Sequence, residues 1–219
     1  MKNPSPKIKE DVSPEFNYKI AKSIKLVRPI HFKHINFWDV VAHRKSVRTF
    51  QSVSLETISE ILWTCAKVKS LSISNSNYIL THRPTASAGA RHPIDILIYS
   101  SALASQDLFY YNPFDHSLNQ LIFDHKLLDS FLIHVNQMMG NKIETAFWFV
   151  AHFSRTEAKY TNAQSLVWRD AGALINAIQL ASIALNIGSC PLGTLGEPYI
   201  SKLLGKRNNI YGVGGILLG

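Results

Sequence analysis

Cysteine is scarce in this chain: Cys65 and Cys190 are the only two, and they lie far apart in the sequence. Two distant cysteines provide neither a disulfide framework nor a cluster of metal ligands. The nine histidines include no His-Glu-x-x-His pair, so the sequence predicts no metal site. This cysteine usage favours a reducing compartment, and we expect a cytoplasmic protein.

Long hydrophobic runs are missing as well. A membrane-spanning helix needs roughly 18 or more consecutive apolar residues, and the nearest candidate, Ala171 to Leu185, contains Asn176 and Gln179. That segment is more typical of a buried helix, and the N-terminus has no apolar core of a secretory signal. With 46% hydrophobic and 17% charged residues, the composition is that of a globular domain without a membrane partner.

Acidic residues are the minority charge, with 15 Asp and Glu against 23 Lys and Arg. Residues 1–36 hold eight of the basic and three of the acidic residues (8 − 3 = +5), which leaves about +3 of the +8 net charge for the rest. The body has no basic face with aromatic stacking partners, so we expect no nucleic-acid binding. We divide the chain into an irregular basic arm (1–35) and one globular domain (36–219). The arm could engage a polyanion or an acidic partner, or it could be a solvated or packed extension.

Hydrophobic periodicity predicts the elements of the domain. Helices are expected at residues 37–44, at 54–65 with Ser54 as N-cap, within 117–139, at 168–185 and at 197–204. Strands are expected at 94–99, 108–111, 146–153 and 210–218. Residues 67–82 are Ser- and Asn-rich and are expected to form a loop, and the arm one helical turn at most. Few strands and long helices predict an α+β fold, in which the helix at 168–185 is apolar on nearly its whole circumference.

A basic run follows the first helix, and in it Arg44, Ser46 and Arg48 can converge on one anion. Two guanidinium groups offer forked donors that suit a phosphate, and the hydroxyl adds a third donor. The competing interpretation is a solvated basic turn.

Two loops of small residues can approach a flat ligand closely. The first contains Ser87, Ala88, Gly89 and Arg91, and the second contains Gly193 and Thr194. Loops kept small for packing would have the same composition, and neither loop has the spacing of a dinucleotide fingerprint.

Lys159 and Tyr160 are adjacent, between the aromatic strand and the long helix. A lysine amine can accept a proton and a phenol can donate one, so such a pair suits acid–base catalysis. A surface coincidence is the alternative for any single Lys-Tyr pair.

Taken in order, these motifs resemble the FMN-dependent nitroreductase family over residues 37–219. The Arg-x-Ser-x-Arg run, the Ser-Ala-Gly loop before a strand, Lys-Tyr, the long helix and the Pro-Leu-Gly turn are most similar to the SagB-type branch, which includes azoline oxidases. The resemblance implies a nitroreductase-like α/β sandwich with a long buried central helix, in an interlocked homodimer with FMN at the interface. It also implies a role for each candidate residue: phosphate and ribityl binding (Arg44, Ser46, Arg48), isoalloxazine contacts (Ser87, Ala88, Gly89, Arg91, Gly193, Thr194) and removal of a ring proton (Lys159, Tyr160).

This chain departs from the usual pattern of that family in its core helix and its turn. Ile175 stands where relatives often have glutamine before Asn176, and Thr194 stands where a second glycine is common. Many members also bind the phosphate with cations after the last strand, whereas this sequence stops at Gly219. Arg44 and Arg48 are therefore expected to carry most of the phosphate charge, with Lys206 and Arg207 as the remaining candidates.

The favoured hypothesis is an FMN-dependent dehydrogenase that oxidises peptide azolines to azoles, beside a cyclodehydratase and a precursor peptide as partners. A flavin reductase that uses NAD(P)H to reduce nitro compounds or quinones is the second hypothesis. A non-catalytic family member acting as a complex partner is the third.

Overall fold

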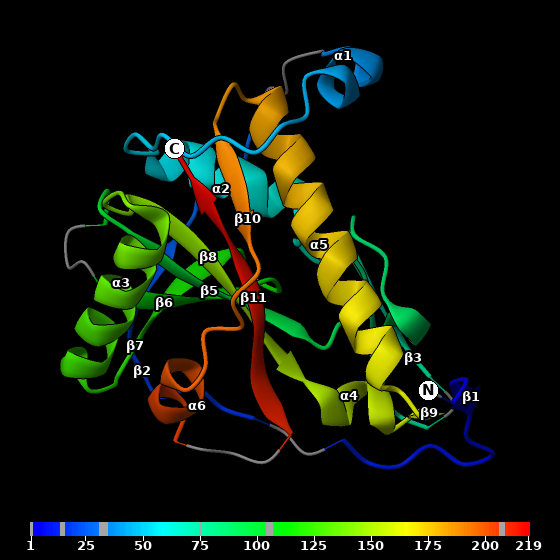
Figure 1. The fold of residues 1–219 in the computed structure, drawn as a ribbon. Helices are drawn as coiled ribbons and strands as arrows, with labels where there is room; N and C mark the ends of the chain where they lie inside the picture. The colour runs from blue at the N-terminus through cyan, green and yellow to red at the C-terminus, as the bar shows by residue number, and fades with distance from the viewer. Residues whose placement is uncertain (1, 14–15, 31–34, 75, 104–106, 206–208) are drawn as a thin grey trace.

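The computed structural model describes residues 2–13, 16–30, 35–74, 76–103, 107–205 and 209–219. At its centre lies a seven-stranded sheet in the order β10-β11-β8-β5-β6-β7-β2 (Figure 1), in which all neighbouring strands are antiparallel. In chain order these strands are β2 (Ile20–Lys25), β5 (Ile94–Ser100), β6 (Leu108–Asn112), β7 (Ser117–Leu121), β8 (Thr145–His152), β10 (Ser189–Leu192) and β11 (Ile210–Leu218).

Six α-helices surround the sheet in the described residues: α1 (Phe37–Ala42), α2 (Leu55–Cys65), α3 (His125–Met139), α4 (Phe153–Glu157), α5 (Gln164–Ala184) and α6 (Tyr199–Leu203). Side chains cap three of them, since Asn36, Ser54 and Asp124 each accept a hydrogen bond from a backbone N–H of the first turn. A cap of this kind is worth about 1 kcal/mol. The helix α3 ends at Gly140, whose φ of 70° suits glycine.

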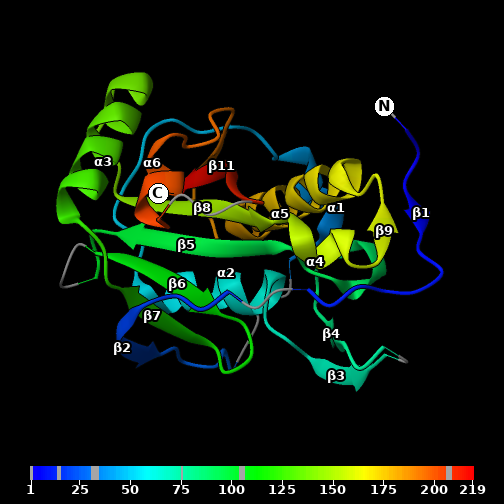
Figure 2. The ribbon, with the colours of Figure 1, turned by 90° about the horizontal axis from the view of Figure 1, so that it is seen from below.

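Side chains of the central strands alternate between two cores. Ile96 and Ile98 of β5 belong to the core that includes α2 and α5, whereas Leu97 and Tyr99 belong to the core that includes α3 and α6. The same alternation runs along β8, whose eight residues are all buried. The sheet is therefore the middle layer of a sandwich, covered by helices on both faces (Figures 1 and 2).

Two small sheets lie outside the central one. The strand β3 (Ser70–Ile73) pairs with β4 (Ile79–His82), and β1 (Ser5–Pro6) pairs with β9 (Tyr160–Thr161). The second pair ties the N-terminal segment to the stretch just before α5 (Figure 2).

The α+β class is confirmed, and so are the strands expected from apolar runs and the helices at 37–44, 54–65, 168–185 and 197–204. The expected helix within 117–139 is wrong in its first part, because Ser117–Leu121 is β7 and the helix begins only at His125. The expected loop at 67–82 is also wrong, since it contains the hairpin β3–β4. In the predicted arm, no described residue is helical and β2 pairs with β7.

None of the helices in the described parts of the chain combines the length and the apolar character that crossing a bilayer requires.

Candidate active site

The Ser87–Ala88–Gly89 loop lies between β4 and β5 and is fixed by a carboxylate of α5. Asp170 accepts hydrogen bonds from Ser87 Oγ at 2.6 Å and from the Ala88 N–H at 3.2 Å. Burial raises the pKa of Asp170, and the bonds from Ser87 and Ala88 partly oppose that rise. The Ser87 hydroxyl and the Ala88 N–H thus already donate to Asp170, whereas the Gly89 N–H has no hydrogen-bond partner among the described residues.

Lys159 and Tyr160 lie directly against this loop. A Cβ atom at Gly89 would be 2.8 Å from Tyr160 Oη and 2.9 Å from Lys159 Cδ. Gly89 has a φ of +60°, a region that glycine enters at little cost. The structure therefore brings together the loop and the Lys-Tyr pair, two motifs separated by about 70 residues in the sequence.

Arg91 adds a buried cation on the same side. Its side chain is 0% exposed, its Nη2 lies 2.5 Å from Glu10 Oε2, and its guanidinium stacks over the Tyr78 ring at 4.0 Å. Glu10 also accepts a hydrogen bond from Ser76 and lies 3.9 Å from Lys159 Nζ. The hydrogen bonds from Arg91 and Ser76 lower the pKa of Glu10. The sequence did not point to Glu10, because nothing in a basic arm marks one glutamate as a partner of Arg91.

Arg44, Ser46 and Arg48 lie elsewhere, in the extended segment after α1. All three residues are exposed, and their side chains make no hydrogen bond or ion pair within the described chain. The backbone between them is anchored, since the Val47 N–H donates to the Ser189 carbonyl at 2.9 Å and Asn141 Nδ2 donates to the Arg48 carbonyl at 3.0 Å. This arrangement gives free guanidinium donors on a fixed backbone, which suits a phosphate. Lys206 and Arg207 lie outside the described residues.

Gly193 and Thr194 form the turn after β10. A Cβ atom at Gly193 would meet nothing within 4 Å, so the turn has open space beside it. The Thr194 hydroxyl accepts a weak hydrogen bond from the Gly196 N–H at 3.4 Å, and Trp148 Nε1 donates to the Leu195 carbonyl at 3.0 Å.

Within one chain, the Ser87 loop with the Lys-Tyr pair and the Arg44–Arg48 segment lie at opposite ends of α5. Asp170, which holds the Ser87 loop, is near the start of α5, while Val47 packs against Gly188, just beyond its end. The fourteen helical rises from Asp170 to Ala184 span about 21 Å at 1.5 Å each. Figure 1 shows α1 at one end of α5 and β9 at the other.

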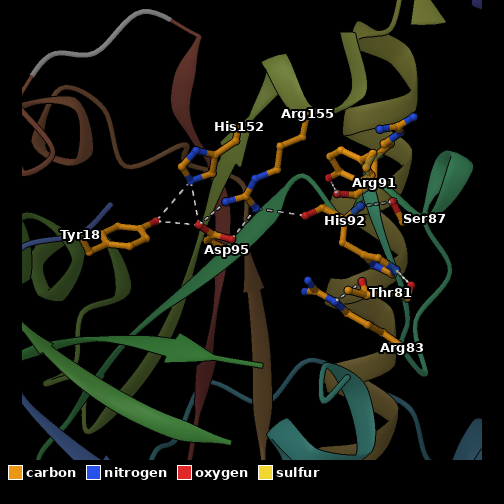
Figure 3. A network of polar contacts seen from close by, with 10 residues as sticks. Tyr18, Thr81, Arg83, Ser87, Arg91, His92, Asp95, His152 and Arg155 are labelled. Carbon is orange, nitrogen blue, oxygen red and sulfur yellow. Dashed lines mark hydrogen bonds and ion pairs between the residues drawn. The ribbon is translucent and has the colours of Figure 1, made fainter. Parts of the chain in front are cut away.

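A buried charged network adjoins the Ser87 loop through His92 (Figure 3). Asp95 accepts two hydrogen bonds from Arg155, at 2.7 and 3.1 Å, pairs with His152 Nε2 at 2.8 Å, and accepts a bond from Tyr18 Oη at 3.0 Å. Burial opposes the ionisation of Asp95, but Arg155 and His152 outweigh it and hold its pKa well below the usual range.

The same network reaches the loop through two further contacts. Arg155 Nη1 also donates to the His92 carbonyl at 3.2 Å, and the His92 N–H donates to Ser87 Oγ at 2.8 Å. Burial lowers the pKa of His92 to about 4. No group of three or more His, Cys, Asp or Glu side chains in the described residues could hold a metal ion.

The sequence matches the nitroreductase family over residues 41–219, and the chain therefore belongs to that family. Comparison with curated protein sequences found no match.

Solved structures with the same fold include a protein from Ralstonia eutropha JMP134 assigned as a nitroreductase, with a TM-score of 0.68 and 18% identity over 100% of this chain and 98% of the other. A similarly assigned protein from Anabaena variabilis ATCC 29413 has a TM-score of 0.67 and 17% identity, over 94% of this chain but 40% of the other. The E. coli microcin synthetase McbBCD complex, solved with truncated pro-MccB17, matches with a TM-score of 0.63 and 17% identity, over 89% of this chain and 76% of the other. At these identities the likeness shows the fold.

Proposed function

We propose that this nitroreductase-family protein is an FMN-dependent dehydrogenase that oxidises peptide azolines to azoles. The observation that carries the proposal is the contact between Gly89 and the Lys159–Tyr160 pair, which puts an acid–base pair against a loop suited to a flat ring. The McbBCD match supports a substrate peptide, because that complex was solved with a truncated precursor, pro-MccB17. A cyclodehydratase complex and a cytoplasmic location follow as parts of the same proposal.

The residues present fit FMN at both ends. Arg44, Ser46 and Arg48 would hold the phosphate and ribityl chain, because their donors have no partner in the described chain. The Gly89 N–H and the open turn at Gly193 and Thr194 would line the isoalloxazine, with Ser87 and Ala88 setting the shape of the loop. When bound, FMN supplies a two-electron acceptor for the ring hydrogen.

One chain does not put the two groups side by side, so we propose that two copies complete each site. A homodimer would use the face of α5 that the single chain leaves open. That face carries the exposed residues of the helix at Trp168, Arg169, Gly172, Ala173 and Asn176. Small residues there allow a second helix to approach closely, and two-fold symmetry would generate two equivalent sites.

The Lys-Tyr pair has a defined role in this scheme. The azoline ring loses one hydrogen with its electron pair to the flavin and one proton to a base, and Lys159 as a neutral amine would accept that proton. Tyr160, beside it, would orient the ring by donating a hydrogen bond from Oη. Arg91 and Glu10 lie next to this pair and would keep the charge of its surroundings balanced.

The test combines flavin binding with turnover. Purified wild-type protein should be yellow with FMN, and Arg44→Ala or Arg48→Ala should weaken FMN binding by about tenfold or more, as expected for the loss of a charged hydrogen-bond pair worth 1.5–3 kcal/mol. Lys159→Ala and Tyr160→Phe should keep FMN and lose turnover of an azoline peptide. As the control, Lys126→Ala removes an exposed cation of α3 that lies outside both groups and outside the proposed dimer face.

Each rival hypothesis has a contrary outcome. Rapid bleaching of the flavin by NAD(P)H, with no azoline turnover, would favour the nitro or quinone reductase. A protein that takes up no added FMN would favour a non-catalytic partner. Full FMN occupancy in both arginine variants would mean that the basic run is a solvated turn and not a phosphate-binding site.

A further inference from the structure

The N-terminal segment lies along the backbone that carries the Lys-Tyr pair. Besides the β1–β9 pairing, the Lys7 N–H donates to the Lys159 carbonyl and the Asp11 N–H to the Ala158 carbonyl, both at 2.8 Å. Apolar contact contributes little to this docking, because Ile8 and Val12 are fully exposed. The match to the nitroreductase family begins at residue 41, so this segment lies outside the matched residues.

Glu10 projects one carboxylate between two cations of the candidate site. Its Oε2 lies 2.5 Å from Arg91 Nη2, and its Oε1 lies 3.9 Å from Lys159 Nζ. The second distance is too long for a hydrogen bond. The attraction therefore acts on the ammonium group without occupying the donors that a substrate would meet.

Arg91 makes the carboxylate hard to replace. Its guanidinium is completely buried, and Nε and Nη1 have no hydrogen-bond partner in the described residues. A buried cation without a counter-ion is costly. Glu10 is the acidic side chain that meets this cation in the described chain, so the Glu10–Arg91 pair fixes where the arm docks.

We propose that Glu10 is a positioning residue for Lys159, which sets the charge balance of the Lys-Tyr pair from outside the residues that match the family. The role in turnover rests on the proposed function, while the action of Glu10 on Lys159 does not. The docked segment leaves 28% of the Lys159 side chain exposed. It is therefore a wall of the site that leaves the lysine accessible to substrate.

Charge removal without a change of shape tests this role. In Glu10→Gln the amide leaves Arg91 and Lys159 as neighbouring cations without a shared counter-ion, and their repulsion favours the neutral amine. Asp11→Asn is the matched control, because Asp11 belongs to the same segment, is 65% exposed and pairs with Lys7.

The readout is the rate at which acetic anhydride labels Lys159 over a range of pH, followed by peptide mass spectrometry on the full chain. Only the neutral amine reacts, so the midpoint of the profile reports charge and the high-pH plateau reports accessibility. Glu10→Gln should lower the midpoint, so that labelling below it becomes about three- to tenfold faster, while Asp11→Asn should match the wild type. The acidic limb of the pH–rate profile for azoline turnover should move in the same direction.

Two results would overturn the proposal. One is an unchanged midpoint in Glu10→Gln. The other is a higher plateau at an unchanged midpoint, which would make the arm a simple cover. A shifted midpoint in a protein that oxidises no azoline would uphold the action of Glu10 on Lys159 and reject the proposed function.

Discussion

Asp95 joins three segments of the chain through side chains alone: Tyr18 from the N-terminal segment, His152 from the end of β8 and Arg155 from α4. A buried ion pair adds little net stability compared with apolar packing, but removal of one partner leaves the other charge without compensation. Arg155 also donates to the His92 carbonyl, and the His92 N–H donates to Ser87 Oγ. The Asp95–Arg155 ion pair therefore helps to fix the backbone beside the Ser87 loop.

We expect Asp95→Asn to lower the free energy of unfolding by about 3–5 kcal/mol at pH 7, because it leaves Arg155, whose side chain is only 23% exposed, without its counter-ion. The pKa of Asp95 is depressed in the folded state, so its contribution is present above the unfolded pKa of about 3.9 and is lost as the pH falls below it. Urea unfolding at several pH values should show the difference between variant and wild type shrinking below about pH 4. Asp129→Asn, an exposed position on α3, should stay within about 0.5 kcal/mol of the wild type.

The Ser87 loop shows how an element of three residues can decide the geometry of a site. Gly89 combines a positive φ with close approach to Lys159 and Tyr160, so any side chain placed at this position would be opposed by the backbone conformation and by these two neighbours. Gly140 at the end of α3 has a similar φ of +70° but nothing within 4 Å of a Cβ atom. A comparison of the two glycines therefore distinguishes the effect of the positive φ, which both share, from the effect of close neighbours, which only Gly89 has.

We expect Gly89→Ala to cost about 1–3 kcal/mol of unfolding free energy and, through displacement of Lys159 and Tyr160, to abolish most azoline turnover. Gly140→Ala should show a similar backbone cost with turnover kept. Chemical denaturation and steady-state kinetics on both variants measure the two effects. Equal activity in the two variants would mean that the loop does not set the position of the Lys-Tyr pair.

Elements with strong local patterns could be predicted from the sequence, and elements made by pairing could not. The short β-branched run of β5 and the Ser54 cap of α2 are local signals and were predicted correctly. The strands of the hairpin β3–β4 are only four residues long and mostly exposed, so the short alternation of Ser70–Ile73 does not stand out from the polar residues around it. The strand β7 buries Asn119, which obscures its pattern. The candidate site residues could be proposed from the sequence, but Glu10 and Asp170 could not, because their contacts join residues about 80 apart.

At the scale of the whole molecule, the 21-residue helix α5 separates the phosphate group of candidates from the Lys-Tyr group. If two copies complete each site, the Arg44–Arg48 segment of one chain would work with the Lys-Tyr pair of the other. This division makes the active unit a dimer even though each chain has its own complete sandwich.

Complementation between two defective chains should show whether each site combines residues of both chains. Arg44→Ala/Arg48→Ala and Lys159→Ala/Tyr160→Phe should each be inactive alone. A heterodimer of the two, purified through a different tag on each chain, contains one site with both groups intact. It should recover about half of the wild-type turnover per dimer, since two-fold symmetry gives two sites. An inactive heterodimer that still binds FMN would mean that each site is built from one chain.

The pairing of β1 with β9 also has a consequence for the order of events during synthesis. Ser5 and Thr161 are 156 residues apart, so the ribosome must add that many residues after Ser5 before its partner exists. At about 5–20 residues per second this takes about 8–30 s. Throughout that interval the Glu10 carboxylate has neither Arg91 nor Lys159 beside it in a folded site. The docking of the first residues is therefore a late step, and an N-terminal fusion partner would interfere with it more than a C-terminal one.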